Sequence, residues 1–496
     1  MAMKQIGLSG STRQTLLAEA LGSLAVELEL PESFPPAVLA EAEAAVAAQE
    51  LPVADATDVA FVTIDPPTST DLDQAVHLER AGDGYTVRYA IADVPSFVAV
   101  GGALDAETRL RGQTLYLPQG RIPLHPDVIG EQAGSLLPEQ VRSAYLWTFR
   151  LGPDGSVLSS ALERAGIRSR AKLSYEGVQA ELDAGTADEC LQLLREVGLK
   201  RIRLEHERGG ASLRLPEQEV ELDDAGHYRL TARAPLPVED WNAQISLMTG
   251  MEAARIMLEG RVGILRTMPA PDERSVAQFR RQAAALGCPW PRETAYGDFL
   301  RSLELEQPKH LALMHAATSL FRGASYTAFD GGAPPEADAV QSAIAAPYAH
   351  ATAPLRRLVD RFVLMVCLSL SQESGVPEEV RAALPLLPDL MQSSNRVAGT
   401  VERASIDAVE AALLHGRVGE RFTGTTIDGP SEAQAAKAAE DGRLPTGTIQ
   451  LLDPPITARY EGRAELGTEV EVELVTADIA RREVLFRIAA ADGRAS

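Results

Sequence analysis

The sequence predicts an α+β protein, with a small helical module first, a large mixed α/β domain next and a five-stranded β-barrel last. Three patterns predict this order. Apolar residues recur at helical spacing between residues 12 and 50, β-type runs begin near residue 58 and yield to helical spacing after residue 235, and five β-type runs follow Gly416. We therefore expect three domains, at residues 1–57, 58–416 and 417–496, in line with the usual ~150 residues per domain.

In the first module, Leu17, Leu21 and Leu24 fall on one side of a helix. The segment PPAVLAEAEAAVAAQ (35–49) then begins a second helix, with prolines in its first turn. Two interpretations remain open: a helix-turn-helix, or two helices that only pack against the rest of the chain.

The middle domain begins with β structure. FVTI (61–64) is a short strand, and VHLER and YTVRYAIAD flank a Gly-Asp-Gly turn, which is typical of a β-hairpin. LWTFRL continues the β pattern. Helical spacing then predicts helices at 239–260, 272–287, 306–321, 354–371 and 395–416.

The last domain contains five short β-type runs, with an acidic polar insert at 429–445. Five strands in about 80 residues are typical of an OB-type barrel. The runs are RFTGTTI, TIQLLD, ITARYEG, TEVEVELV and EVLFRIA.

The composition describes an acidic chain with ample core material. Of 496 residues, 45% are apolar, and the net charge of −23 argues against a protein that coats nucleic acid non-specifically. Cys190, Cys288 and Cys367 are far apart, which suits free thiols in a reducing cytoplasm. The N-terminus lacks an apolar signal segment, and the apolar run 362–368 is too short to span a membrane. We expect a cytoplasmic monomer with no membrane association.

Two segments carry residues suited to chemistry. TIDPPTSTDLDQA (63–75) places Asp65 at a strand end and Asp71 and Asp73 in the following loop. Three converging carboxylates could hold a hard divalent cation such as Mg²⁺, although an acidic chain could equally carry them in a solvated loop.

The second segment is YAHATAPLRRLVDRF (348–362). It predicts a helix capped by Thr352, with Pro354, Arg356 and Arg357 in its first turn. Two cations at that end oppose the helix dipole, which makes sense if an anion such as a phosphate binds there. The alternative is that both arginines pair with neighbouring acids.

These strings, taken in order, resemble the ribonuclease II family. The resemblance covers residues 58–416, and the C-terminal barrel fits it too. Besides the two segments above, it rests on IADVPSFV, ALDAETRLRGQTLYLP, RIPLHP, SLLPEQVRSA, KLSYEGV and VERASIDA.

The resemblance implies a 3′-to-5′ exoribonuclease that threads single-stranded RNA into a channel and releases nucleoside 5′-monophosphates. Metal-assisted hydrolysis needs an activated water and charge stabilisation on the phosphate, which one or two Mg²⁺ ions, or Mn²⁺ as a substitute, and an arginine supply. On this basis Asp71, Asp73 and Arg356 are the expected catalytic residues. The expected metal ligands are Asp65, Asp71, Asp73 and Gln74, and the expected RNA-binding residues are Tyr116, Tyr175, Arg356, Arg357 and Glu402.

Gln74 departs from the family pattern, which has a second aspartate after Asp73. Its amide can offer an oxygen to a metal but no charge, so we expect one bound ion and leave open whether a second binds. This favours, as an alternative, an RNA-binding regulator with weakened catalysis on the same fold. An OB-type translation factor would leave the aspartates and the arginine segment unexplained.

Relatives of this kind commonly carry two cold-shock domains before the catalytic domain. Here about 57 residues precede it, and they have helical spacing. We therefore expect a short helical module in place of those barrels.

Overall fold

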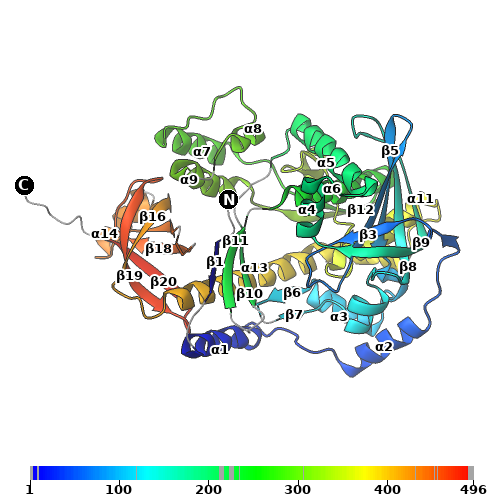
Figure 1. Ribbon diagram of the computed structural model, residues 1–496, viewed down its shortest axis with the longest axis horizontal. Helices are drawn as coiled ribbons and strands as arrows, with labels where there is room; N and C mark the ends of the chain where they lie inside the picture. Colours follow the sequence, from blue (N-terminus) through cyan, green and yellow to red (C-terminus); the bar gives the residue numbers. More distant parts are fainter. Residues whose placement is uncertain are drawn as a thin grey trace, which may run out of the picture.

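A computed structural model describes residues 4–7, 11–118, 120–211, 217–222, 228–233, 235–304, 307–430, 432–451, 453–454 and 456–489. The predicted α+β organisation is confirmed: the large mixed sheet lies at one end of the molecule and the barrel at the other (Figure 1). The long helix α13 (Leu387–Leu414) runs between them.

The central sheet has six strands in the order β2-β9-β3-β4-β5-β8. The long strand β9 pairs with β8 along its first part and with β3 along its last, so the sheet curves back on itself. The strands are β2 (Ala54–Asp55), β3 (Phe61–Ile64), β4 (Gln74–Ala81), β5 (Gly84–Ala92), β8 (Val141–Leu151) and β9 (Val157–Leu173).

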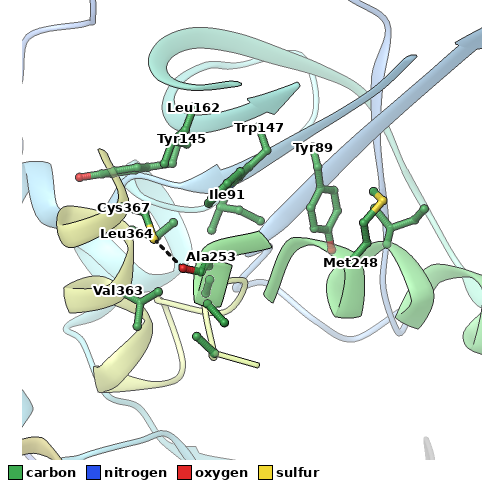
Figure 2. Close-up of a cluster of buried hydrophobic side chains, with 14 of the residues drawn as sticks. Tyr89, Ile91, Tyr145, Trp147, Leu162, Met248, Ala253, Val363, Leu364 and Cys367 are labelled. Carbon is green, nitrogen blue, oxygen red and sulfur yellow. Dashed lines mark hydrogen bonds between the residues drawn. The ribbon is translucent and has the colours of Figure 1, made fainter. Parts of the chain in front are cut away.

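Helices α6 (Pro237–Gly260) and α11 (Leu358–Ser371) supply much of the core against this sheet. Figure 2 shows Tyr89 and Trp147 of the strands beside Met248 of α6 and Leu364 of α11. Burial of such side chains contributes roughly 1.5–3 kcal/mol each, which makes this layer a rigid base for the loops at its edge. The helices α3 (Ala103–Arg111), α4 (Tyr175–Ala184), α5 (Glu189–Arg208) and α12 (Glu378–Ala383) complete this part of the chain.

The short hairpin of β6 (Leu115–Leu117) and β7 (Gly120–Ile122) lies beside α13. A π-helical turn, η2 (Val128–Ala133), follows it. Further along are the strand pair β12 (Val262–Thr267) and β13 (Ser325–Asp330), and the helices α7 (Glu273–Ala285), α8 (Tyr296–Arg301) and α9 (Pro308–Ala317).

The two N-terminal helices attach to different places. Helix α1 (Ser11–Glu27) buries Leu17, Leu21 and Leu24 in a cluster with α13 and the barrel, whereas α2 (Pro36–Ala47) packs on α3. In this structure the two helices therefore pack against separate parts of the chain. Before them, β1 (Lys4–Gly7) pairs with β11 (Tyr228–Arg233), which in turn pairs with β10 (Glu217–Leu222).

The predicted five-stranded barrel is confirmed, and it is closed in the order β16-β17-β18-β20-β19. Part of the polar insert forms α14 (Glu432–Glu440). Phe422, Tyr460 and Phe486 are buried in the barrel, so these rings fill its core rather than offer stacking surfaces. The strands are β16 (Arg421–Asp428), β17 (Thr446–Leu451), β18 (Thr457–Glu461), β19 (Glu469–Asp478) and β20 (Glu483–Ile488).

No helix in the described part of the chain has the length and apolarity needed to cross a membrane.

Candidate active site

The loop between β3 and β4 carries the three aspartates, and hydrogen bonds fasten it in place. The Asp65 backbone N–H donates to Leu173 O at 3.0 Å, directly after β3 ends. Further along, the Leu72 N–H donates to Ser135 Oγ at 3.0 Å, and that hydroxyl donates to Thr70 O at 2.7 Å. The loop backbone is therefore fixed before any ligand is considered.

Asp73 lies buried at the end of this loop, next to the arginine segment. Its Oδ1 accepts a hydrogen bond from the Leu355 N–H at 2.8 Å, and its Oδ2 lies 3.5 Å from Arg356 Nε. Burial raises the pKa of Asp73 well above its usual range, and the Arg356 guanidinium opposes this rise. Arg356 thus favours the charged form of a carboxylate whose charge burial disfavours.

The prediction that Thr352 caps a helix with both arginines in its first turn is wrong. Helix α11 begins at Leu358, because the preceding residues form a turn held by another segment. The Thr114 N–H donates to Arg356 O at 3.0 Å, and the Leu358 N–H donates to Gly112 O at 3.0 Å. These tertiary bonds override the local capping signal.

The two neighbouring arginines have different surroundings. The Arg357 guanidinium pairs with Asp360, with Nε 2.5 Å from Oδ2 and Nη2 3.0 Å from Oδ1. Both arginines lie beside an acid, as in the alternative interpretation, since Arg356 Nε is 3.5 Å from Asp73 Oδ2. The Arg356 side chain is 46% exposed, so Arg356 is the one placed to meet a phosphate.

Asp71 has partners on both of its oxygens. Its Oδ1 accepts from Arg121 Nη1 at 2.7 Å, and its Oδ2 accepts from the Tyr116 hydroxyl at 3.2 Å. The predicted Tyr116 is therefore at the site, and it is 55% exposed. Sequence reasoning missed Arg121, which lies in the RIPLHP string but has no local signal that links it to Asp71.

Asp65 supplies the best evidence for a cation. Its Oδ2 is buried and has no hydrogen-bond partner among the described residues. Burial raises the pKa of Asp65 to about 6, Lys172 opposes this rise, and the Asp71 charge adds to it. A divalent cation would satisfy this oxygen and offset the charge repulsion between Asp65 and Asp71.

As they stand, the described residues contain no cluster of three or more His, Cys, Asp or Glu side chains arranged to hold a metal ion. In this arrangement Asp71, one of the expected ligands, is paired with Arg121. The donor set itself, carboxylate oxygens around a buried site, suits a hard divalent cation.

Gln74 uses both ends of its amide inside the fold. Its Oε1 accepts from the Tyr89 hydroxyl at 2.8 Å, and its Nε2 donates to Thr352 O at 2.6 Å. A metal ion would have to compete with Tyr89 for the amide oxygen.

The other two predicted RNA-binding residues differ in their relation to the site. Tyr175 is the first residue of α4, and its hydroxyl lies 3.4 Å from Asn242 Nδ2 of α6. Burial and the Asp65 charge raise the pKa of Tyr175. Glu402 lies on the exposed side of α13, and no contact described for it reaches the aspartates. Sequence reasoning assigned no residue of α6 to the site, yet Asn242 reaches it.

Comparison with known protein families identifies the family to which this chain belongs. A family model described as the RNB domain matches residues 53–371, which is more than half of the chain, and a model described as the RNase II-type exonuclease C-terminal S1 domain matches residues 432–489. The chain belongs to the RNB-domain family. The resemblance to ribonuclease II is thereby confirmed, and the second match falls on the closed barrel.

Among curated relatives, the exosome complex exonuclease RRP44 homolog A of Arabidopsis thaliana is 29% identical over 70% of this chain and 38% of its own length. Ribonuclease R of Aquifex aeolicus is 25% identical over 85% of this chain and 61% of its own length. The chain thus spans less than two thirds of the length of these relatives.

Two solved structures show the same fold. The apo form of Mycoplasma genitalium RNase R matches with a TM-score of 0.83 at 17% identity, covering 95% of this chain and 78% of that chain. Yeast Ssd1, described as a pseudonuclease, matches with a TM-score of 0.69 at 15% identity, covering 89% of this chain and 55% of that chain. Because a nuclease and a pseudonuclease share the fold, the side chains of the site must carry the argument for activity.

Proposed function

We propose that this RNB-domain chain is a 3′-to-5′ exoribonuclease that hydrolyses single-stranded RNA to nucleoside 5′-monophosphates with one Mg²⁺ ion, for which Mn²⁺ is expected to substitute. The observation that carries this proposal is the contact between Asp73 and Arg356, which puts a buried carboxylate beside a half-exposed guanidinium. Phosphodiester hydrolysis needs both a cation site and a positive group that faces the phosphate.

The residues have separable tasks. Asp65 and Asp73, with Asp71 once its arginine is displaced, would hold the ion. When bound, the ion supplies Lewis-acid stabilisation of the phosphate and lowers the pKa of a coordinated water. Arg356 donates charge-assisted hydrogen bonds to a non-bridging phosphate oxygen, and the short turn before α11 aims it.

The RNA end would be recognised by two tyrosines, Tyr116 and Tyr175, and by Glu402, the acid that the family resemblance suggests. Tyr116, exposed on β6, and Tyr175, at the start of α4, flank the aspartate loop and would contact the terminal nucleotides. Glu402 is proposed to meet the sugar of a nearby nucleotide. The 2′-hydroxyl distinguishes RNA from DNA, so oligo(A) is expected to be cleaved faster than oligo(dA).

One assay tests the proposal. The chain is incubated with oligo(A) that carries a label at its 5′ end, or in parallel in every phosphate, with Mg²⁺ or with EDTA, and the products are separated on a sequencing gel. We expect progressive shortening from the 3′ end and release of mononucleotides only with Mg²⁺. Binding without shortening at any Mg²⁺ concentration would overturn the enzyme assignment.

That outcome would favour the second candidate, an RNA-binding regulator with weakened catalysis. The observation behind it is Gln74, which replaces a carboxylate and whose amide is committed to Tyr89 and Thr352. We further propose that the chain acts as a monomer in the cytoplasm, supported by free Cys190, Cys288 and Cys367, since reduced thiols are usual there.

A further inference from the structure

The Arg121 guanidinium lies between two carboxylates that belong to different elements. Its Nη1 is 2.7 Å from Asp71 Oδ1 in the aspartate loop, and its Nη2 pairs with Glu131 of the π-helical turn η2. The same Nη2 lies 2.5 Å from Thr70 Oγ1, and that hydroxyl is 2.9 Å from Glu131 Oε2. The Arg121 guanidinium is therefore shared by the carboxylates of Asp71 and Glu131.

The Arg121 guanidinium therefore lies against Asp71, one of the proposed metal ligands. Arg121 and Tyr116 between them occupy both oxygens of Asp71, whereas Asp65 Oδ2 has no partner among the described residues. The side chains of Asp71 and Arg121 are only 11% and 21% exposed, so solvent screens their attraction weakly. A divalent cation at Asp71 Oδ1 would lie beside the positive Arg121 guanidinium and be repelled by it, so the ion and Arg121 compete for this carboxylate.

We propose that Arg121 is a positioning residue that competes with the cation for Asp71 and transfers to Glu131 when the cation binds, so that Glu131 tunes metal affinity. The inference rests on the metal site of the proposed function. The transfer needs no new partner, because Glu131 already contacts the guanidinium. It also leaves no partly buried charge unpaired, which would cost several kcal/mol.

A static clamp makes the opposite prediction. If Arg121 only orients Asp71 toward the ion, its removal weakens metal binding. If Arg121 competes with the ion, its removal strengthens metal binding. The sign of one measurement separates these two roles.

The test measures Mn²⁺ binding to the full chain without RNA, from the loss of the free-ion signal in electron paramagnetic resonance. We expect Arg121→Met to bind Mn²⁺ about tenfold more tightly than wild type, and Glu131→Gln about fivefold more weakly, since ~1.4 kcal/mol corresponds to a factor of ten. Opposite changes in two variants cannot both come from a shared loss of fold.

A double variant separates the transfer from simple charge effects. If Glu131 acts through Arg121, Glu131→Gln changes affinity by less than about twofold in the Arg121→Met background, because coupled residues are not additive. Glu139→Gln is the matched control: it makes the same substitution at an exposed glutamate whose side chain has no described contact with Arg121 or Glu131. We expect it to stay within about twofold of wild type in both backgrounds.

Three results would overturn the inference. Weaker or unchanged Mn²⁺ binding in Arg121→Met would make Arg121 a clamp or a bystander. An equal effect of Glu131→Gln in both backgrounds would show that Glu131 acts by its charge alone. Mn²⁺ binding that Asp73→Asn leaves intact would show that the ion binds elsewhere, and the metal site of the proposed function would fall as well.

Discussion

The Leu355 N–H donates a hydrogen bond to Asp73 Oδ1 at 2.8 Å, although 282 positions separate the two residues. This bond joins the loop of the three aspartates, where the sequence predicts a cation site, to the turn that carries Arg356, where it predicts an anion site. It leaves Asp73 Oδ2 facing Arg356 Nε at 3.5 Å. The acid and the arginine are thus positioned by one contact, and we expect them to behave as a unit.

Asp73→Asn should abolish hydrolysis while RNA binding persists. The amide retains an oxygen that can accept from Leu355, so the turn is preserved, but the charge that would hold a cation is lost. The rate on oligo(A) and the RNA affinity should be measured separately. Asp83→Asn, an exposed aspartate in the turn between β4 and β5, is the control and should behave as wild type. A rate within about threefold of wild type for Asp73→Asn would remove it from the catalytic residues.

Arg356→Ala should lower the rate by about 10²–10³ with a smaller loss of RNA affinity, as for other single donors that stabilise transition-state charge. Thermal stability should fall less than in Arg357→Ala, because the Arg356–Asp73 contact is longer, at 3.5 Å, and the arginine side chain is half exposed. If affinity falls and the rate at saturating RNA does not, Arg356 is a tether rather than a catalytic residue.

The adjacent arginine offers a matched comparison. Arg357→Ala breaks a buried ion pair and leaves Asp360 uncompensated, which costs about 3–5 kcal/mol. We expect a clear drop in the unfolding midpoint for Arg357→Ala. Similar stability losses in both variants would contradict the different roles assigned to them.

The contrast between these arginines shows where sequence reasoning reaches its limit. Helical spacing correctly predicts α11, but Thr352 and Pro354 suggest that this helix begins too early. Backbone hydrogen bonds with Gly112 and Thr114 hold the preceding residues in a turn, so the helix begins at Leu358. A capping pattern is local, whereas those partners lie more than 200 positions away.

Side-chain partners are harder still to predict. The aspartates are recognisable from their spacing, and the family resemblance adds Tyr116 and Tyr175. The ion pair of Arg121 with Asp71 and the amide bonds of Gln74 have no signature in the chain, because each depends on how separate loops meet.

Gln74→Asp tests the departure from the family pattern. A carboxylate here should lower the Mg²⁺ concentration needed for half-maximal rate, because it adds charge beside Asp73. The shorter side chain loses the bonds to Tyr89 and Thr352, so stability should fall by about 1–3 kcal/mol. An unchanged or higher Mg²⁺ requirement would show that the remaining ligands already compensate for the glutamine.

We expect low pH to destabilise the fold at the turn that carries Arg356, because His125 is buried against this turn. The ring is buried, and its Nε2 lies 3.1 Å from Pro354 O, which can only accept, so Nε2 carries the proton. Burial and the positive charges of Arg361 and Arg111 together lower the pKa of His125 to about 3, and the bond to Pro354 O opposes this fall. The folded chain therefore keeps this histidine neutral at pH values where the unfolded chain protonates it.

The sign of the pH dependence follows from that difference. The contribution of His125 is fully present above the unfolded pKa of about 6.5 and is lost as the pH falls toward 3, by up to about 1.4 kcal/mol per pH unit. Urea unfolding at pH 7.5 and at pH 5 should show a smaller loss of stability for His125→Gln than for wild type, by about 2 kcal/mol. Glutamine keeps a donor for Pro354 but does not titrate, so the comparison isolates the proton. Equal losses in the two proteins would mean that His125 takes up its proton without disturbing the fold.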